Sequence, residues 1–247
     1  GRSTAGNKIG DVLPHLAELD ITVTDDLDQD LDIVFSALPH TTSAKWLSSF
    51  LDNGIRAIDI SADFRLRNVG QYKQWYGTEH PCPQYLTEAV YGLPELYSDA
   101  VPSAKVIANP GCYPTAAILA LAPALKAGII QADIIIDAKS GVSGAGRDGY
   151  SYSEVNESAV AYKVEGHQHL PEITQELASI NDSAKPKVTF VPHLIPMTRG
   201  ILATCYAPLD TSGFESGSDY TTQVRDIYNE FYLDKPFVRV ENAPPMT

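Results

Sequence analysis

The first half of the chain alternates short apolar runs with an amphipathic stretch. The nearly continuous apolar run at 31–38 is typical of a buried parallel strand, and residues 55–60 predict the next one. Between them, residues 42–52 carry apolar side chains at helical spacing, with a threonine able to cap the helix and an Asn-Gly pair able to end it. This order predicts a βαβ unit with parallel strands and a right-handed crossover.

The next apolar run leads into the stretch Asn109-Pro-Gly-Cys-Tyr-Pro-Thr115. Residues 104–108 predict a strand, and a helix pattern begins at Pro114 and runs to about residue 127. We therefore expect Cys112 at a strand-to-helix junction, where unpaired backbone N–H groups and the helix dipole lower a thiol's pKa. A small buried hydrophobic role is the alternative, and position alone leaves the two open.

After residue 130, strands and helices interleave less regularly. Strands are predicted at 132–139, 187–191, 201–206 and 237–240, and helices at 171–180 and 218–232. This order favours an α+β domain with a mainly antiparallel sheet. We predict an α/β chain with its domain boundary between residues 111 and 112, which puts Cys112 between the domains, a usual place for a site.

Composition and charge exclude several classes of function. The 247 residues are 44% hydrophobic, and no run approaches the ~18 apolar residues of a membrane helix. The net charge of −13 disfavours nucleic-acid or anionic-membrane binding, so an anionic substrate would need local cations. Cys82, Cys112 and Cys205 show no CxxC spacing, which indicates a reducing compartment, and we expect a cytoplasmic protein.

A glycine-rich loop, residues 141–147, follows the predicted strand 132–139. Its spacing is GxxGxG, not the dinucleotide fingerprint, and no amphipathic helix follows at once. The loop can form a concavity of backbone N–H groups that accepts a phosphate or lies against a planar ring. A surface hairpin is the alternative, but Lys139 and Arg147 beside the loop favour a binding role.

Two histidines stand close together between Gly166 and Glu172. His167 and His169, two apart in an extended segment, would point to the same side. One of them could be the general base of a Cys–His pair. The pair could instead cap the helix beginning at Pro171, or join Glu172 in a metal site.

Cations and a further histidine mark two other segments. Asp63 and Arg65 follow the strand 55–60, at the edge where open α/β sheets bind ligands, or they form a local ion pair that shapes the loop. Arg199, in a segment that links two predicted strands, is a candidate clamp for a carboxylate or phosphate. His193 of the same segment suits a structural role as well as a ligand role.

These motifs together resemble the N-acetyl-γ-glutamyl-phosphate reductases of arginine biosynthesis. The matching stretches occur in family order along the chain, and 109–115 with 140–147 are the most specific. The resemblance implies an NADP-binding Rossmann domain at 1–111 and an α+β, glyceraldehyde-3-phosphate-dehydrogenase-like catalytic and dimerisation domain at 112–247. The family's N-terminal strand, Gly-rich loop and helix are absent before Gly1, and the family continues beyond Thr247.

The resemblance also implies roles for individual residues. Cys112 matches the nucleophile and His167 the acid/base, with His169 the next candidate; Asn109 and nearby backbone N–H groups are candidates for stabilising the oxyanion. The residues assigned to NADP(H) are Arg2, Ser3, Leu38, Pro39, Ser140, Gly141, Ser143 and Gly144. The residues assigned to the substrate's carboxylate and phosphate are His169, Arg147, Lys163 and Arg199. No metal is expected.

The implied reaction is NADPH-dependent reduction of N-acetyl-γ-glutamyl phosphate to N-acetylglutamate semialdehyde and phosphate, through a thioester on Cys112. We expect a homo-oligomer, either a dimer or a tetramer, that binds no nucleic acid and no membrane. A close rival is the same chemistry on a carrier-bound aminoadipyl or glutamyl phosphate, which the net charge of −13 disfavours. Two more distant rivals are a cofactor-free Cys–His hydrolase and a non-catalytic binding remnant.

Overall fold

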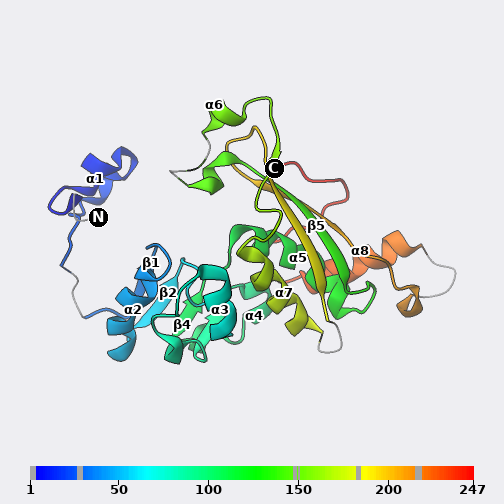
Figure 1. Cartoon of the computed structure of the whole chain (residues 1–247), viewed down its shortest axis with the longest axis horizontal. Coiled ribbons are helices and arrows are strands. Elements are labelled where there is room, and N and C mark those ends of the chain that lie inside the picture. Colours follow the sequence, from blue (N-terminus) through cyan, green and yellow to red (C-terminus); the bar gives the residue numbers. More distant parts are fainter. Residues whose placement is uncertain (1–3, 27–29, 147–148, 150, 182–184, 215–218) are drawn as a thin grey trace.

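A parallel sheet forms the centre of the N-terminal half of the molecule (Figure 1). The computed structural model describes residues 4–26, 30–146, 149, 151–181, 185–214 and 219–247. The four strands pair in the order β1-β2-β4-β3, all parallel, which confirms the predicted parallel arrangement. They are β1 (Ile33–Ser36), β2 (Arg56–Asp59), β3 (Ala89–Tyr91) and β4 (Val106–Ala108).

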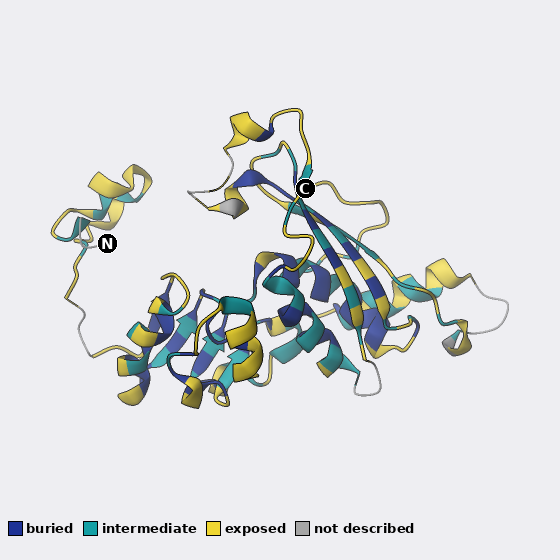
Figure 2. Cartoon of the chain, viewed as in Figure 1, coloured by how far each residue is buried: buried dark blue, intermediate teal, exposed yellow. Residues whose placement is uncertain are grey.

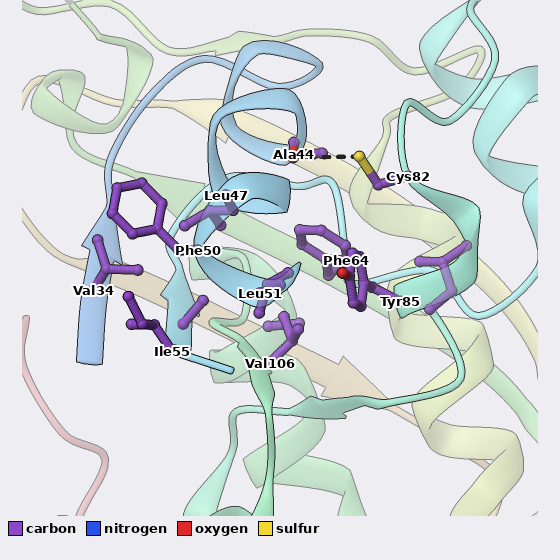
Figure 3. Packing of buried hydrophobic residues seen from close by; sticks show 13 residues of the cluster. Val34, Ala44, Leu47, Phe50, Leu51, Ile55, Phe64, Cys82, Tyr85 and Val106 are labelled. Carbon is purple, nitrogen blue, oxygen red and sulfur yellow. Dashed lines mark hydrogen bonds between the residues drawn. The ribbon is translucent and has the colours of Figure 1, made fainter. Parts of the chain in front are cut away.

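One face of this sheet packs on helix α2 (Thr42–Asp52), as the sequence predicts. The core between them is apolar (Figure 3), and its labelled members include Val34, Leu47, Phe50, Leu51, Ile55 and Val106. The edge strand β1 is buried on one face only, because Phe35 remains 62% exposed. The short elements around the sheet are α1 (Ile9–Val12), η2 (Pro14–Leu19), α3 (Val69–Tyr76), η3 (Pro83–Tyr85), α4 (Pro94–Tyr97) and η4 (Val101–Ser103).

The C-terminal half contains a second, mixed sheet in the order β6-β7-β5-β8. Its central pair, β5 with β7, is parallel, while the two outer pairings are antiparallel. The strand predicted at 237–240 is wrong, because the Val238 N–H turns back to the carbonyl of Lys235 and Phe237 is 92% exposed. The strands are β5 (Asp133–Ser140), β6 (Val160–Ala161), β7 (Lys187–Leu194) and β8 (Ile201–Tyr206).

Helices α5 (Cys112–Lys126) and α7 (His169–Ile180) cover the inner face of the second sheet. Buried and exposed residues alternate along β5, as Figure 2 shows, so its other face stays open in the described chain. Helix α5 continues through the buried Pro123 to Lys126, close to the predicted end near residue 127. No helix in the described ranges is both long and apolar enough to cross a membrane. The remaining elements are η5 (Val142–Ala145), α6 (Tyr152–Val155), η6 (Thr211–Gly213) and α8 (Tyr220–Phe231).

Asp63 ties three segments together at the carboxyl edge of the parallel sheet. Its fully buried carboxylate accepts the Thr41 N–H at 2.8 Å, the Ala44 N–H at 2.9 Å and the Tyr72 hydroxyl at 2.6 Å. Thr41 has a φ of +65°, a strained conformation for a β-branched residue that these bonds help to hold. The alternative of a local ion pair between Asp63 and Arg65 is wrong, since Arg65 reaches Glu172 of α7 instead.

Replacing Asp63 with alanine removes the acceptor of two backbone N–H groups and one buried hydroxyl. We expect D63A to lose about 3 kcal/mol or more of unfolding free energy in urea, since each unsatisfied buried donor costs roughly 1–3 kcal/mol. The matched control is Asp219→Ala, which removes an exposed cap from the N–H groups of Thr221 and Thr222 and is expected to cost about 1 kcal/mol. Equal losses in the two variants would contradict this account.

Candidate active site

Cys112 is the first residue of α5 and lies exposed where β4 gives way to that helix. Gly111 before it has an extended backbone, with φ −66° and ψ 155°. The Gly111 carbonyl accepts both the N–H and the hydroxyl of Thr115 at 2.9 Å. The predicted strand-to-helix junction is therefore confirmed, and the alternative of a buried hydrophobic cysteine is wrong.

The surroundings of Cys112 raise the pKa of its thiol above the ordinary value, contrary to the expectation from the helix dipole. The residue is exposed overall, yet enough protein surrounds the sulfur for the loss of solvent to be the largest effect. The backbone N–H groups of Tyr113 and Cys112, together with the charge on Arg65, oppose this rise, and the charge on Glu172 adds to it. The thiol is therefore mostly protonated at neutral pH, and its attack on a substrate requires a proton acceptor.

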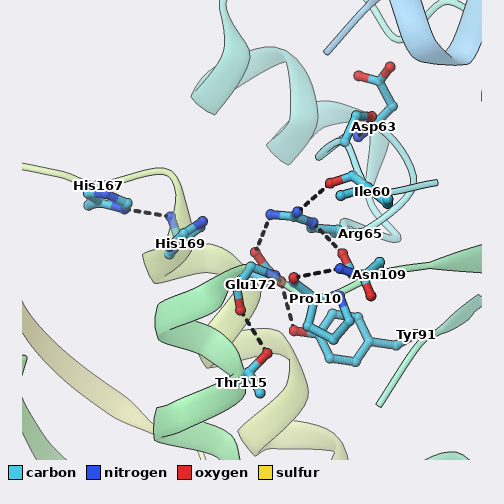
Figure 4. A network of polar contacts seen from close by, with 12 residues as sticks. Ile60, Asp63, Arg65, Tyr91, Asn109, Pro110, Thr115, His167, His169 and Glu172 are labelled. Atoms are coloured by element: carbon cyan, nitrogen blue, oxygen red, sulfur yellow. Dashed lines mark hydrogen bonds and ion pairs between the residues drawn. The ribbon is translucent and has the colours of Figure 1, made fainter. Parts of the chain in front are cut away.

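The backbone just before Cys112 is held by Glu172, a carboxylate on α7 that is only 1% exposed (Figure 4). Its Oε1 accepts the Gly111 N–H at 2.8 Å and the Tyr91 hydroxyl at 2.7 Å. Its Oε2 lies 3.5 Å from Nη1 of Arg65. Burial raises the pKa of this carboxyl group, and the Arg65 charge and the two hydrogen bonds oppose that rise.

His167 and His169 lie together at the start of α7, with ring centroids 4.7 Å apart. The Nδ1 atom of His167 accepts the His169 N–H at 3.0 Å, which caps the first N–H group of the helix. We therefore assign the neutral His167 ring its proton on Nε2. Burial, the largest cause for each ring, lowers the pKa of His167 to about 4 and that of His169 to about 3. Both rings are neutral at pH 7.

The His169 ring lies directly against Gly111. A β-carbon at Gly111 would come within 2.5 Å of the His169 Nε2 and 2.9 Å of the Arg65 Nη1, so only glycine fits without displacing them. The Nδ1 atom of His169 is buried with no hydrogen-bond partner in the described part of the chain. Both histidine rings also pack edge-on against Tyr113, at 5.8 and 5.9 Å between centroids. The two histidines and the nucleophile loop thus form one site.

The metal site considered from the sequence is not formed. Glu172 faces Gly111 and Arg65 rather than the two histidines (Figure 4). No group of three His, Cys, Asp or Glu side chains that could hold a metal ion is found among the residues with a described position. The capping role is confirmed for His167, and it is compatible with proton chemistry at the opposite ring nitrogen.

The first part of the glycine-rich loop does not supply free N–H donors to the predicted concavity. Its first three N–H groups, in residues 141–143, each donate at 3.0 Å to carbonyls of the 197–200 loop. A β-carbon on Gly141 would lie 2.7 Å from the backbone nitrogen of Arg199, so the two loops touch. The prediction that the loop accepts a phosphate is wrong for these three N–H groups, because each already donates a hydrogen bond to a backbone carbonyl.

The residues assigned to the cofactor lie at two places. Leu38 and Pro39 are exposed just after β1, at the carboxyl edge of the parallel sheet. Ser140 is buried at the end of β5, and Ser143 and Gly144 are exposed in the loop that follows. Outside the described residues lie three predicted site residues, Arg2, Ser3 and Arg147.

The remaining predicted site residues have local environments. Lys163 is exposed, and its Nζ donates to the side chain of Gln168 at 2.7 Å. Arg199 is exposed in the loop between β7 and β8. The amide of Asn109 donates to the neighbouring carbonyl of Pro110 at 3.3 Å. These contacts leave their roles in binding and in oxyanion stabilisation as predictions.

Two tyrosines beside the site escaped prediction from the sequence. Tyr91 of β3 reaches Glu172 across the two halves of the molecule. The hydroxyl of Tyr162 lies 2.9 Å from that of Tyr113. No spacing in the sequence points to these pairs, because their members are between 49 and 81 positions apart. The one signal in the sequence was for Glu172, which stands three residues after His169 on one helix.

Comparison with known proteins assigns a family to both halves of the chain. Residues 1–104 match the family model described as semialdehyde dehydrogenase, NAD binding domain. Residues 112–247 match the model described as semialdehyde dehydrogenase, dimerisation domain.

Similar sequences carry one name. The N-acetyl-gamma-glutamyl-phosphate reductase of Dehalococcoides mccartyi strain 195 is 48% identical over 250 residues, covering all of this chain and 72% of that protein. Proteins of the same name from Heliobacterium modesticaldum and Geobacillus stearothermophilus are each 46% identical, covering 73% and 69% of their lengths and 100% and 96% of this chain.

Solved structures share the fold at low sequence identity. Aspartate semialdehyde dehydrogenase with NADP from Candida albicans has a TM-score of 0.60 at 14% identity, and it covers 92% of this chain. Aspartate semialdehyde dehydrogenase II from Vibrio cholerae has a TM-score of 0.59 at 17% identity, covering 82% of this chain. The chain spans 66% and 62% of those two structures. The likeness confirms the fold.

The raised thiol pKa predicts how Cys112 reacts with iodoacetamide. Because the thiolate is the reacting form, the alkylation rate should rise with pH and reach half its plateau above the value of about 8.5 for a free cysteine. Peptide mass spectrometry would locate the label, with Cys112→Ser as the control for reaction at Cys82, which is buried, and Cys205, whose pKa burial raises to about 11. An alkylation midpoint near pH 7 would show that the helix N-terminus lowers the pKa of the Cys112 thiol by more than desolvation raises it.

Proposed function

We propose a function from one premise: the chain belongs to the semialdehyde dehydrogenase family and, within it, to the N-acetyl-γ-glutamyl-phosphate reductases. The function is NADPH-dependent reduction of N-acetyl-γ-glutamyl phosphate to N-acetylglutamate semialdehyde and phosphate. The observation that carries it is an exposed cysteine at the N-terminus of α5, whose neighbours in the chain contact two neutral histidines: His169 lies against Gly111, and both rings pack on Tyr113. This arrangement suits a thiol that forms and releases an acyl intermediate.

The first step is transfer of the acyl group to Cys112. The sulfur attacks the γ-acyl carbon, the bond to phosphate breaks, and a thioester forms. Because the thiol pKa is raised and both imidazole pKa values are lowered, we propose that the thiol proton leaves in concert with attack. His169 is the proposed acceptor, since its ring lies against Gly111 while Nδ1 of His167 is already engaged.

The second step is reduction of the thioester and release of the aldehyde. When bound, NADPH supplies the hydride that reduces the thioester carbon. We propose that His167 acts as the acid/base from Nε2 toward the oxygen of the resulting thiohemiacetal, whose negative charge the N–H groups at the start of α5 also stabilise. The proton that His169 took in the first step passes to the departing phosphate, which leaves the imidazole neutral again. Collapse of the thiohemiacetal expels the Cys112 thiolate, which takes up one proton from solvent, and the balance closes.

The described residues suit a dinucleotide at the edge where parallel sheets bind such ligands. Leu38 and Pro39 lie exposed at this edge, and we propose that they hold the adenosine side of NADP(H). The exposed Ser143 and Gly144 are proposed to lie against the nicotinamide. Arg199 and Lys163 are the proposed partners of the substrate's carboxylate and phosphate, which offsets the net charge of −13 locally.

We further propose that the chain forms a dimer through the open face of the second sheet. On this face Ile135 of β5 pairs in register with Tyr206 of β8, and both are about half exposed, at 48% and 55%. Beside them Asp137 contacts Lys139 at 2.5 Å and His193 at 3.2 Å, which supports a structural role for that histidine. The matching dimerisation-domain model supports self-association of this half. We also propose, separately from the dimer, that the domain boundary falls after residue 111 and that the protein is cytoplasmic.

The dimer proposal predicts the effect of a charge on that face. We expect Tyr206→Asp to convert the full-length protein to a monomer by light scattering, because an unpaired carboxylate would be buried in the contact. The control is Tyr220→Asp, a similarly exposed tyrosine on α8, at 45%, which should leave the mass unchanged. A wild-type monomer, or an unchanged dimer in the Tyr206 variant, would contradict the proposed surface.

The reaction is tested with the full-length protein in the reverse direction. We expect phosphate-dependent reduction of NADP by N-acetylglutamate semialdehyde, and loss of at least about 1,000-fold in kcat for Cys112→Ser, because the hydroxyl is a far weaker nucleophile than the thiolate. His167→Asn should slow the same assay more than Lys163→Gln, whose side chain is assigned to binding only.

Three results would overturn this assignment. If Cys112→Ser keeps most of the activity, Cys112 is not the nucleophile. Turnover only with a carrier-bound aminoadipyl or glutamyl substrate would support the carrier rival. Absence of NADPH binding would support a hydrolase, if an ester is cleaved, or a binding protein, if none is.

A further inference from the structure

Helix α7 presents two buried carboxylates, one turn apart, to the opposite half of the molecule. Glu172 and Glu176 are 1% and 0% exposed. Each faces an arginine from the segment after β2: Arg65 lies 3.5 Å from Glu172, and Arg67 lies 2.9 Å from Glu176. Each also accepts a tyrosine hydroxyl, from Tyr91 and Tyr97 respectively. The two Arg–Glu–Tyr triads are alike in composition and in burial of the carboxylate.

The triads differ in what else the carboxylate touches. Glu172 accepts the Gly111 N–H at 2.8 Å, so it is bonded to the residue that precedes the nucleophile. Its partner Arg65 donates from Nε to the Asn109 carbonyl at 2.8 Å and lies against Gly111. Glu176 instead bonds Arg67 and the neighbouring Gln175, and neither of these bonds involves residues 109–112; Gln175 also donates to the Arg65 carbonyl at 2.9 Å. One triad therefore holds the nucleophile loop at two points, and the other serves as an internal reference.

Two charged side chains act on the Cys112 thiol, and several other titratable groups surround it. Arg65 carries the positive charge and Glu172 the negative one, and both act on Cys112. The other titratable groups facing this region are Tyr113 on the same helix, Tyr162 and Lys163 after β6, and His167 and His169 at the start of α7; the Lys163 charge acts on both histidines. Both histidines are neutral at pH 7, so the net field at the thiol depends mainly on the Arg65–Glu172 pair.

We propose that Glu172 is a positioning residue for Cys112: together with Arg65 it fixes the backbone at Gly111 and balances the charge beside the thiol. The Gly111 carbonyl is held at the same time by Thr115, so the residue before the nucleophile is fixed on both sides. Glu172 does not touch the reacting atoms and acts through Gly111 and Arg65. The effect on turnover rests on the proposed function, whereas the effect on thiol reactivity does not.

The test compares Glu172→Gln with Glu176→Gln in the full-length protein. In E172Q the Arg65 charge is no longer balanced beside the thiol, so the pH midpoint of iodoacetamide alkylation at Cys112 should fall and alkylation at pH 7 should speed up. Turnover should move the opposite way, with kcat down by about 100-fold and KM little changed, because the loop is misplaced. E176Q should keep the wild-type midpoint, although it loses stability.

Opposite movement of alkylation and turnover is the signature of positioning, since a general loosening of the fold would affect E172Q and E176Q alike. An unchanged alkylation midpoint in folded E172Q would overturn the proposal even if turnover falls. A shifted midpoint without any reductase activity in the wild type would uphold it and reject the proposed function instead.

Should E172Q fail to fold, Tyr91→Phe tests the same carboxylate with less disturbance. It removes one of the two hydrogen bonds that Oε1 of Glu172 accepts, so the carboxylate is held less firmly beside Gly111 and Arg65, and the alkylation midpoint should shift downward, but by less. No shift in this variant would overturn the proposal.

Discussion

The site depends on a carboxylate that is buried between the two halves of the molecule. Glu172 belongs to the helix that begins with the two histidines, yet its bonds go to Gly111, Tyr91 and Arg65 on the other side. Leaving the charge of Glu172 or Arg65 unpaired in the interior would cost several kcal/mol, so the two residues must stay close together. Helix α7 therefore cannot shift without carrying the nucleophile loop and the end of the parallel sheet with it.

This constraint explains why residues far apart in the chain form one compact site. Cys112 follows β4 and is the first residue of α5, and the histidines at the start of α7 lie against the residues on either side of it, Gly111 and Tyr113. Glycine at position 111 is the residue that permits this contact, because any side chain there would collide with His169 and Arg65. Close approach of the backbone, rather than a special φ angle, is the reason for glycine here.

Two opposing effects act on the thiol, and the structure decides between them. The N–H groups at the helix start favour the thiolate, but the loss of solvent around the sulfur outweighs them and the pKa rises. The same burial keeps both histidines neutral. The resting site is thus an uncharged thiol and two uncharged imidazoles beside one buried ion pair, which suits proton transfer coupled to attack on a substrate.

Local pattern alone determined three of the four parallel strands, helix α2, the junction at Cys112 and most elements of the second half, because hydrophobic periodicity and capping residues act over a few positions. It did not predict β3, whose three residues are too few to show a period. The sequence motifs also identified the nucleophile and the histidine pair as candidates. The strand predicted at 237–240 is not formed, because a pattern of alternating apolar residues makes a strand only where a neighbouring strand is available to pair with it. Tertiary structure decided that Glu172 serves the loop rather than a metal, that the N–H groups at 141–143 are already engaged, and that desolvation sets the thiol pKa. Each of these depends on groups tens of residues apart, and on how much water the folded chain excludes between them.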